Sequence, residues 1–154
     1  MPHYSQSRRV AVPVDQLFSV VSDVSLYPDF IAGITEIIAG DDVEGGGGSV
    51  SREFTLVVSA IGMRQEATGR VLLDAGRSRI SFELVKGPMS NFHALFQFKD
   101  DGDETRLAVD VSCEFRNKIV AALVTPFFDT AMRKLVAAFA KRALSLAGPA
   151  YGGR

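Results

Sequence analysis

The amino-acid sequence predicts a single α+β domain in which a curved antiparallel sheet of about six to seven strands wraps around a long C-terminal helix. Apolar and polar residues alternate with period two through much of 34–115, as in half-buried strands, and apolar residues recur at helical spacing across 118–146. The chain of 154 residues has the size of one domain. Only the long helix is large enough to cover the apolar face of such a sheet.

The N-terminal segment is expected to contribute one strand and two short helices. Residues 10 to 12, with the polar stretch before them, are read as a strand. Residues 14 to 31 carry an apolar stripe typical of a helix, and Pro28 disfavours the helical conformation at Tyr27. We therefore expect a turn at Pro28, with short helices on either side of it.

Turn signals divide the region 34–115 into strands. They fall at 41–48, 74–77, 87–88 and 100–103, and Ile34 to Ala39 forms a further strand. Residue parity then predicts one apolar face, formed by Val50, Phe54, Leu56, Ile61, Met63, Ala67, Val71, Leu73, Ile80, Phe82, Leu84, Phe92, Phe96, Phe98, Leu107, Val109, Val111, Cys113 and Phe115.

The C-terminal region 118–146 is predicted to be one long amphipathic helix. Pro126 removes a backbone donor, so we expect a kink or break near Thr125. Gly148-Pro149 is expected to end the helix. The domain is therefore predicted to span 1–148, with 149–154 as a flexible tail.

Composition excludes several classes of protein. A lone cysteine, Cys113, cannot form a disulfide within the chain or a cysteine-rich metal site, and it fits a reducing compartment. No apolar run has the length of a membrane span, and no secretory signal is recognised, so we expect a soluble, cytoplasmic protein. The net charge of −1 conceals a basic C-terminal region, because residues 116–154 hold seven basic residues and one acid.

Particular residues give the chain a family resemblance. The most specific stretch is Val20-Val21-Ser22-Asp23-Val24 followed by Tyr27-Pro28-Asp29-Phe30; the others are Gly87-Pro88, Glu114-Phe115-Arg116-Asn117, Pro126, Phe128, Met132, Phe139 and Lys141-Arg142-Ala143. The chain thereby resembles the coenzyme Q-binding family of the START/polyketide cyclase and lipid transport superfamily. Ile31-Ala32-Gly33 and the absence of tryptophan depart from the family pattern.

The resemblance implies a helix-grip fold around an apolar cavity that binds ubiquinone or a related polyprenyl lipid. It implies a non-catalytic quinone carrier that supports respiratory electron transport or quinone biosynthesis, with no cofactor required. Some bacterial relatives are instead toxins of toxin–antitoxin systems that block association of the ribosomal subunits. A polyketide cyclase or aromatase is a third alternative.

We predict that the cavity is lined by aromatic and apolar residues of both layers, with two polar side chains of inward parity. The predicted lining residues are Tyr27, Phe30, Arg52, Phe54, Met63, Gln65, Ala67, Phe82, Phe92, Phe96, Phe128, Met132, Val136 and Phe139. Ordinary core packing is the alternative for the phenylalanines. The segment from Tyr27 to Phe30 is either a lid or gate at the cavity entrance, or a turn whose Tyr and Phe side chains close off the hydrophobic core. We expect Arg52 to pair with an acid or to lie at the cavity mouth, where it could bond a quinone carbonyl; the alternative is that a bulge or the strand end takes it to water.

A basic helix face is the candidate membrane contact. Arg133, Lys134, Lys141 and Arg142 suit the inner, anionic face of the cytoplasmic membrane, with a solvated helix face as the alternative. No DNA partner is expected, and the ribosome is a partner only under the toxin hypothesis. We predict no metal site and no catalytic residues. His93 is expected at the surface, and Gly45 to Gly48 is read as a flexible hairpin.

Overall fold

The computed structural model describes residues 2–60, 62–87 and 89–151, although the side chains of residues 60, 63 and 147–151 lie outside the described part. Its elements are β1 (His3–Val10), α1 (Val14–Ser22), the 3-10 helix η1 (Val24–Asp29), β2 (Ile34–Ala39), β3 (Val43–Glu44), the 3-10 turn η2 (Gly46–Gly48), β4 (Val50–Ala60), β5 (Met63–Asp74), the 3-10 turn η3 (Ala75–Arg77), β6 (Arg79–Lys86), β7 (Met89–Asp101), β8 (Glu104–Phe115) and α2 (Lys118–Tyr151).

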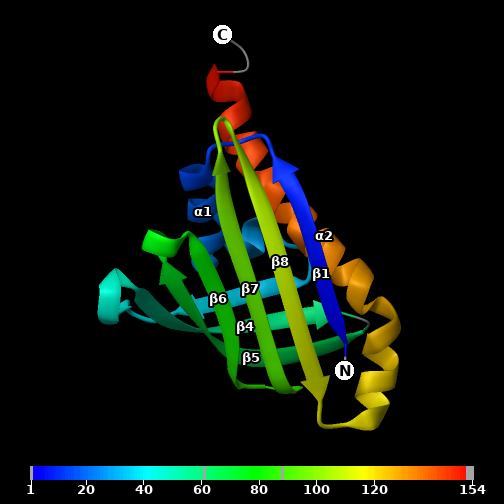
Figure 1. The fold of residues 1–154 in the computed structure, drawn as a ribbon. Coiled ribbons are helices and arrows are strands. Elements are labelled where there is room, and N and C mark those ends of the chain that lie inside the picture. The colour runs from blue at the N-terminus through cyan, green and yellow to red at the C-terminus, as the bar shows by residue number, and fades with distance from the viewer. Residues whose placement is uncertain (1, 61, 88, 152–154) are drawn as a thin grey trace.

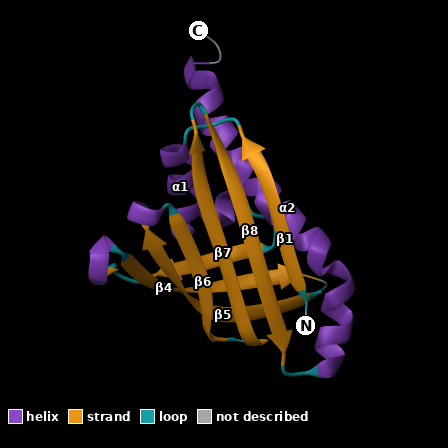
Figure 2. Ribbon diagram, in the orientation of Figure 1, coloured by secondary structure: helices purple, strands orange, loops and turns teal. Residues whose placement is uncertain are grey.

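The strands form one antiparallel, eight-stranded sheet. Its order is β1-β8-β7-β6-β5-β4-β2, and β3 pairs with β4. Figure 1 shows β4 and β5 running across the direction of β7 and β8, which makes the sheet strongly curved. Figure 2 shows α2 along one side of this sheet, with α1 near the far end of the molecule. The predicted α+β architecture is therefore confirmed.

Residue alternation produces the buried face of the sheet, as predicted. In β8, Leu107, Val109, Val111 and Cys113 are buried, while the residues between them are exposed or half-buried. Phe96 in β7 and Ile80 in β6 are almost fully buried beneath α2 and α1. The apolar face is therefore covered on the side where the helices lie.

The C-terminal half of α2 closes the core. Val136, Phe139, Ala140 and Ala143 are each at most 2% exposed and belong to the same buried cluster as the sheet residues. The N-terminal half differs, because Ile119, Leu123 and Phe127 are 50% exposed or more. Apart from Phe128, the deeply buried residues described in this helix therefore lie in its second half.

Two expectations for α2 are wrong. The helix is not broken near Thr125: it continues through Pro126, and the Thr125 hydroxyl donates to the Ala121 carbonyl at 2.6 Å. The proline ring lies on an exposed part of the helix, and packing of the later turns offsets the lost backbone bond. The helix also runs to Tyr151, beyond Gly148-Pro149.

Candidate functional site

A cavity of about 1090 Å³ lies between the concave face of the sheet and α2. Strands β4 to β8 supply one wall, α2 supplies the other, and η1 with the start of β2 forms part of the boundary. A binding site for a small molecule typically measures about 300–1,000 Å³, so this cavity can hold a large one. Most of its lining side chains are aliphatic or aromatic.

Aromatic rings line the cavity as a chain of edge-to-face contacts that joins three elements. Phe139 of α2 lies at the centre: its ring centroid is 5.4 Å from that of Tyr27 and 5.6 Å from that of Phe96. The chain continues across the sheet from Phe96 to Phe82 and then to Phe54. Such contacts fix ring orientations, so this wall of the cavity is built before any ligand arrives.

Gly69 makes room for this wall on β5. A Cβ at this position would lie 2.9 Å from Cζ of Phe54 and 3.3 Å from the Glu83 carbonyl oxygen. The absence of a side chain lets the Phe54 ring lie flat against the strand. The glycine is therefore a shape determinant of the cavity.

Few polar groups of the lining are free to act on a ligand. The Tyr27 hydroxyl donates to the Val21 carbonyl, and burial raises the pKa of Tyr27 well above its ordinary value. The carboxylate of Glu83 is bound by Arg70 at 2.9 Å. The hydroxyl of Thr68 shares a hydrogen bond with that of Thr55 at 2.9 Å. Each of these groups therefore already has a partner within the protein.

Three cations of α2 line the cavity. Lys134 and Lys141 are exposed and Arg142 is half-buried. The Arg142 guanidinium carbon lies 5.3 Å from the centre of the Phe30 ring, a cation–π contact at the junction of η1 and α2. Arg133, the fourth residue of the predicted basic face, is exposed and does not line the cavity.

The structure brings nine of the predicted lining residues to the cavity: Tyr27, Phe30, Phe54, Ala67, Phe82, Phe92, Phe96, Met132 and Phe139. Four others do not line it. Phe128 and Val136 are buried in the core instead, and Gln65 is exposed near the β4–β5 turn, where the strand has passed the core. The side chain of Met63 lies outside the described residues. Arg52 is the fourth predicted residue that does not line the cavity.

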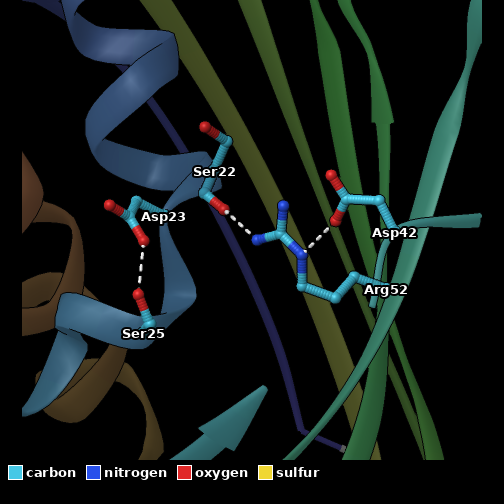
Figure 3. A network of polar contacts seen from close by, with 5 residues as sticks. All are labelled: Ser22, Asp23, Ser25, Asp42 and Arg52. Atoms are coloured by element: carbon cyan, nitrogen blue, oxygen red, sulfur yellow. Dashed lines mark hydrogen bonds and ion pairs between the residues drawn. The ribbon is translucent and has the colours of Figure 1, made fainter. Parts of the chain in front are cut away.

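Arg52 is held at the edge of the core by polar partners, as Figure 3 shows. Its Nε donates to Asp42 at 2.5 Å, and one terminal nitrogen donates to the Ser22 carbonyl at 3.5 Å. The hydrogen bond from Arg52 lowers the pKa of Asp42. Arg52 thus links β4 to the end of α1: it pairs with an acid, one of the outcomes expected of it, and does not line the cavity. Asp23 accepts a hydrogen bond from the Ser25 hydroxyl.

Sequence reasoning missed several lining residues. Leu56 and Leu84 share the strand parity of Phe54 and Phe82, so that signal was available. No such signal was available for Ala131 and Ala138 of α2, because small residues on a helix face are also typical of close helix packing. In this structure the two alanines leave room for the cavity.

The part of the chain that the structure describes lacks two kinds of feature. No helix in this part of the chain is long and apolar enough to cross a membrane. No three His, Cys, Asp or Glu side chains gather there in an arrangement able to hold a metal ion. His93 is exposed, as predicted, and Gly46 to Gly48 forms a short turn before β4.

Comparison with known proteins agrees with this geometry. The model of the family described as polyketide cyclase/dehydrase and lipid transport matches residues 10–140. A Pseudomonas aeruginosa protein named ribosome association toxin RatA is 29% identical, over 95% of this chain and 98% of its own length.

Solved structures share the fold. A START superfamily protein from Mycobacterium smegmatis superposes with a TM-score of 0.78 at 22% identity, covering 94% of this chain and 98% of its own. The Zhui aromatase/cyclase of a Streptomyces species superposes with a TM-score of 0.73 at 19% identity, covering 92% of each chain. The architecture is therefore the START/Bet v 1-like helix-grip fold.

Proposed function

Because the chain belongs to the polyketide cyclase/dehydrase and lipid transport family, we propose that its cavity binds ubiquinone or a related polyprenyl lipid. In this proposal the protein is a carrier that keeps the lipid tail out of water and supports respiratory electron transport or quinone biosynthesis. It is not an enzyme.

The cavity itself is the observation that carries the proposal. It measures about 1090 Å³ and most of its lining is apolar. Burial of a hydrocarbon tail there would contribute roughly 25 cal/mol per Å² of apolar surface. The aromatic chain offers ring edges and faces to a quinone head group.

The carboxylate and the phenol of the cavity lining are already engaged, and its lysines, Lys134 and Lys141, are exposed, which favours a carrier over a cyclase. The carboxylate of Glu83 and the hydroxyl of Tyr27 are both engaged within the protein. Arg52 and Gln65, the two polar side chains of inward parity, do not line the cavity. General acid–base catalysis needs a titratable group within hydrogen-bond reach of the substrate.

The test is to identify the lipid that accompanies the protein. Protein purified without detergent from a quinone-producing host should carry extractable quinone, detectable by mass spectrometry at up to one molecule per chain. Added ubiquinone should bind to the emptied protein. Repeated recovery of no quinone, together with no binding of added ubiquinone, would refute the proposal.

A lipid carrier must bind to a membrane surface to collect or release its ligand, and α2 offers a surface for this contact. Ile119, Leu123 and Phe127 are exposed at helical spacing, and Arg133 and Lys134 extend the same side of the helix with positive charge. Each basic residue is worth about 1 kcal/mol near anionic lipid. Sedimentation with vesicles should require anionic lipid and should weaken in Phe127→Asn; equal sedimentation with neutral vesicles would contradict this part of the proposal.

A second candidate function is ribosome binding, favoured by the Pseudomonas aeruginosa relative with its printed name of ribosome association toxin. Under this alternative, overexpression should arrest growth and the protein should co-sediment with a ribosomal subunit. Both effects should persist when the cavity is filled by Ala138→Phe. Growth arrest that is lost with the cavity would count against a purely ribosomal role.

A further inference from the structure

We propose that the cavity prefers lipids whose polar end is anionic, a carboxylate or a phosphate joined to an apolar tail, over neutral lipids with the same tail. This inference rests on the proposed function, because it concerns the same cavity. It goes beyond that function by selecting, among lipids with equal tails, those that carry a negative charge at the head.

The first observation is the convergence of positive charge on one edge of the cavity. Lys141 and Arg142 follow Lys134 by seven and eight residues on α2, which is about two turns, so the three cations lie along one side of the helix. All three line the cavity, and Ser145 continues the same edge with a hydroxyl group.

The second observation is that the described part of the protein supplies no negative partner to these three cations. None of them takes part in an ion pair with a described residue. Glu83 also lines the cavity, but its carboxylate is bound by Arg70 at 2.9 Å. The cations therefore stand beside an apolar space without a neutralising acid, where an anion from a ligand would be favoured.

The third observation is the position of Arg142. Its guanidinium carbon lies over the ring of Phe30, 5.3 Å from the ring centre. A guanidinium in this position still carries five N–H donors for other partners. No described acceptor binds these N–H groups. They are available to a carboxylate or phosphate oxygen.

The apolar interior sets the orientation of such a ligand. The aromatic chain leads from Tyr27, next to the Phe30–Arg142 contact, across the sheet to Phe54, and a charged group buried among its rings would lose hydration without a partner. The tail therefore enters and the anion stays at the basic edge. Two of the three cations are exposed to solvent, which screens them, so the gain is moderate.

The experiment compares ligands that differ only at the head. Farnesoic acid, farnesyl phosphate and farnesol would each displace the neutral fluorescent probe N-phenyl-1-naphthylamine at pH 7.5. Three exposed or half-exposed ion pairs sum to roughly 1.4 kcal/mol, so both anions should bind about tenfold more tightly than farnesol. Inorganic phosphate should displace no probe, because it lacks the tail. Raising the salt concentration should shrink the preference.

Charge removal on α2 supplies the matched control. The variant Lys134→Gln/Lys141→Gln/Arg142→Gln should lose the preference for the anions over farnesol. Arg133→Gln removes one charge from the same helix, outside the cavity, and should keep the preference. If the triple variant unfolds, Lys134→Gln/Lys141→Gln changes only exposed side chains and should lose part of it.

The two proposals fail in different ways. Equal affinity for acid and alcohol in the native protein, or an unchanged preference in the charge variants, overturns the anionic head group and leaves the lipid carrier standing. No displacement of the probe by any farnesyl compound, with no binding of ubiquinone, overturns the carrier itself.

Discussion

At the scale of single residues, Tyr27 shows how a buried hydroxyl couples the rim of the cavity to α1. Its side chain is 5% exposed, its hydroxyl donates to the Val21 carbonyl, and its ring contacts both Phe30 and Phe139. A buried carbonyl left without its donor costs free energy. The hydroxyl therefore fixes the position of the cavity's aromatic rim.

The variant Tyr27→Phe should be about 1 kcal/mol less stable than the native protein at pH 7, because it loses one buried hydrogen bond. The order should reverse at high pH. Burial raises the pKa of Tyr27 in the folded state, so the stability that the neutral phenol contributes is complete below pH 10 and is lost above it. The loss should reach at most about 1.4 kcal/mol per pH unit.

Urea unfolding from pH 7 to pH 11 measures this difference. Parallel stability curves for the two proteins above pH 10 would show that Tyr27 ionises as easily in the folded state as in the unfolded chain.

Arg52 gives the opposite pH dependence through Asp42. The pKa of Asp42 is lowered in the folded state, so its contribution to stability is present above its unfolded value near pH 4 and disappears as the pH falls through the folded value. Asp42→Asn should have a slightly lower melting temperature than the native protein at pH 7 and an equal one at pH 2. Asp41→Asn, its neighbour, serves as the control and should change little at either pH.

At the scale of elements, strand parity was the most informative signal in the sequence. It placed Phe54, Phe82 and Phe96 correctly because each strand has one dry face, and a period of two leaves no ambiguity there. It misplaced Arg52 and Gln65 because parity says which side a residue faces but not where the core ends along the strand. Gln65 lies where β5 extends past the packed region, whereas Arg52 pairs with the buried Val71 and is turned from the cavity by its bonds to Asp42 and the Ser22 carbonyl.

The helix α2 was harder to resolve from its sequence. Its apolar residues face three different environments along the chain: solvent at Phe127, the hydrophobic core at Val136, and the cavity at Ala138. A helical period identifies the helix but cannot separate these environments. The same limit explains why Phe128 and Val136 were predicted to line the cavity and are instead buried in the core.

Phe139 is where α2 holds the sheet and η1 together. Its ring is 1% exposed and contacts Tyr27, Phe30 and Phe96 edge to face. Phe139→Ala should lower the free energy of unfolding by about 3 kcal/mol, since it removes a large buried side chain. Urea unfolding measures this loss. Phe127→Ala, on an exposed turn of the same helix, should cost far less, and equal losses would contradict the assigned packing.

At the scale of the whole molecule, the cavity is a property that no single element carries. The cavity exists because the sheet curves away from α2. Small residues, among them Gly69 and Ala138, also have no large side chain that would fill the space between the two layers. The family resemblance led us to expect it. The residues alone were equally consistent with a solid aromatic core, because sequence patterns give burial but not volume.

The most direct test of the account is ubiquinone binding by a protein whose cavity has been filled. Ala138→Phe places a ring into the cavity from α2, whereas Ala122→Phe adds the same ring to an exposed turn of the same helix. Native mass spectrometry should show one ubiquinone per chain in the native protein and in Ala122→Phe, and none in Ala138→Phe. Equal occupancy in all three folded proteins would contradict the claim that the ligand lies between the sheet and α2.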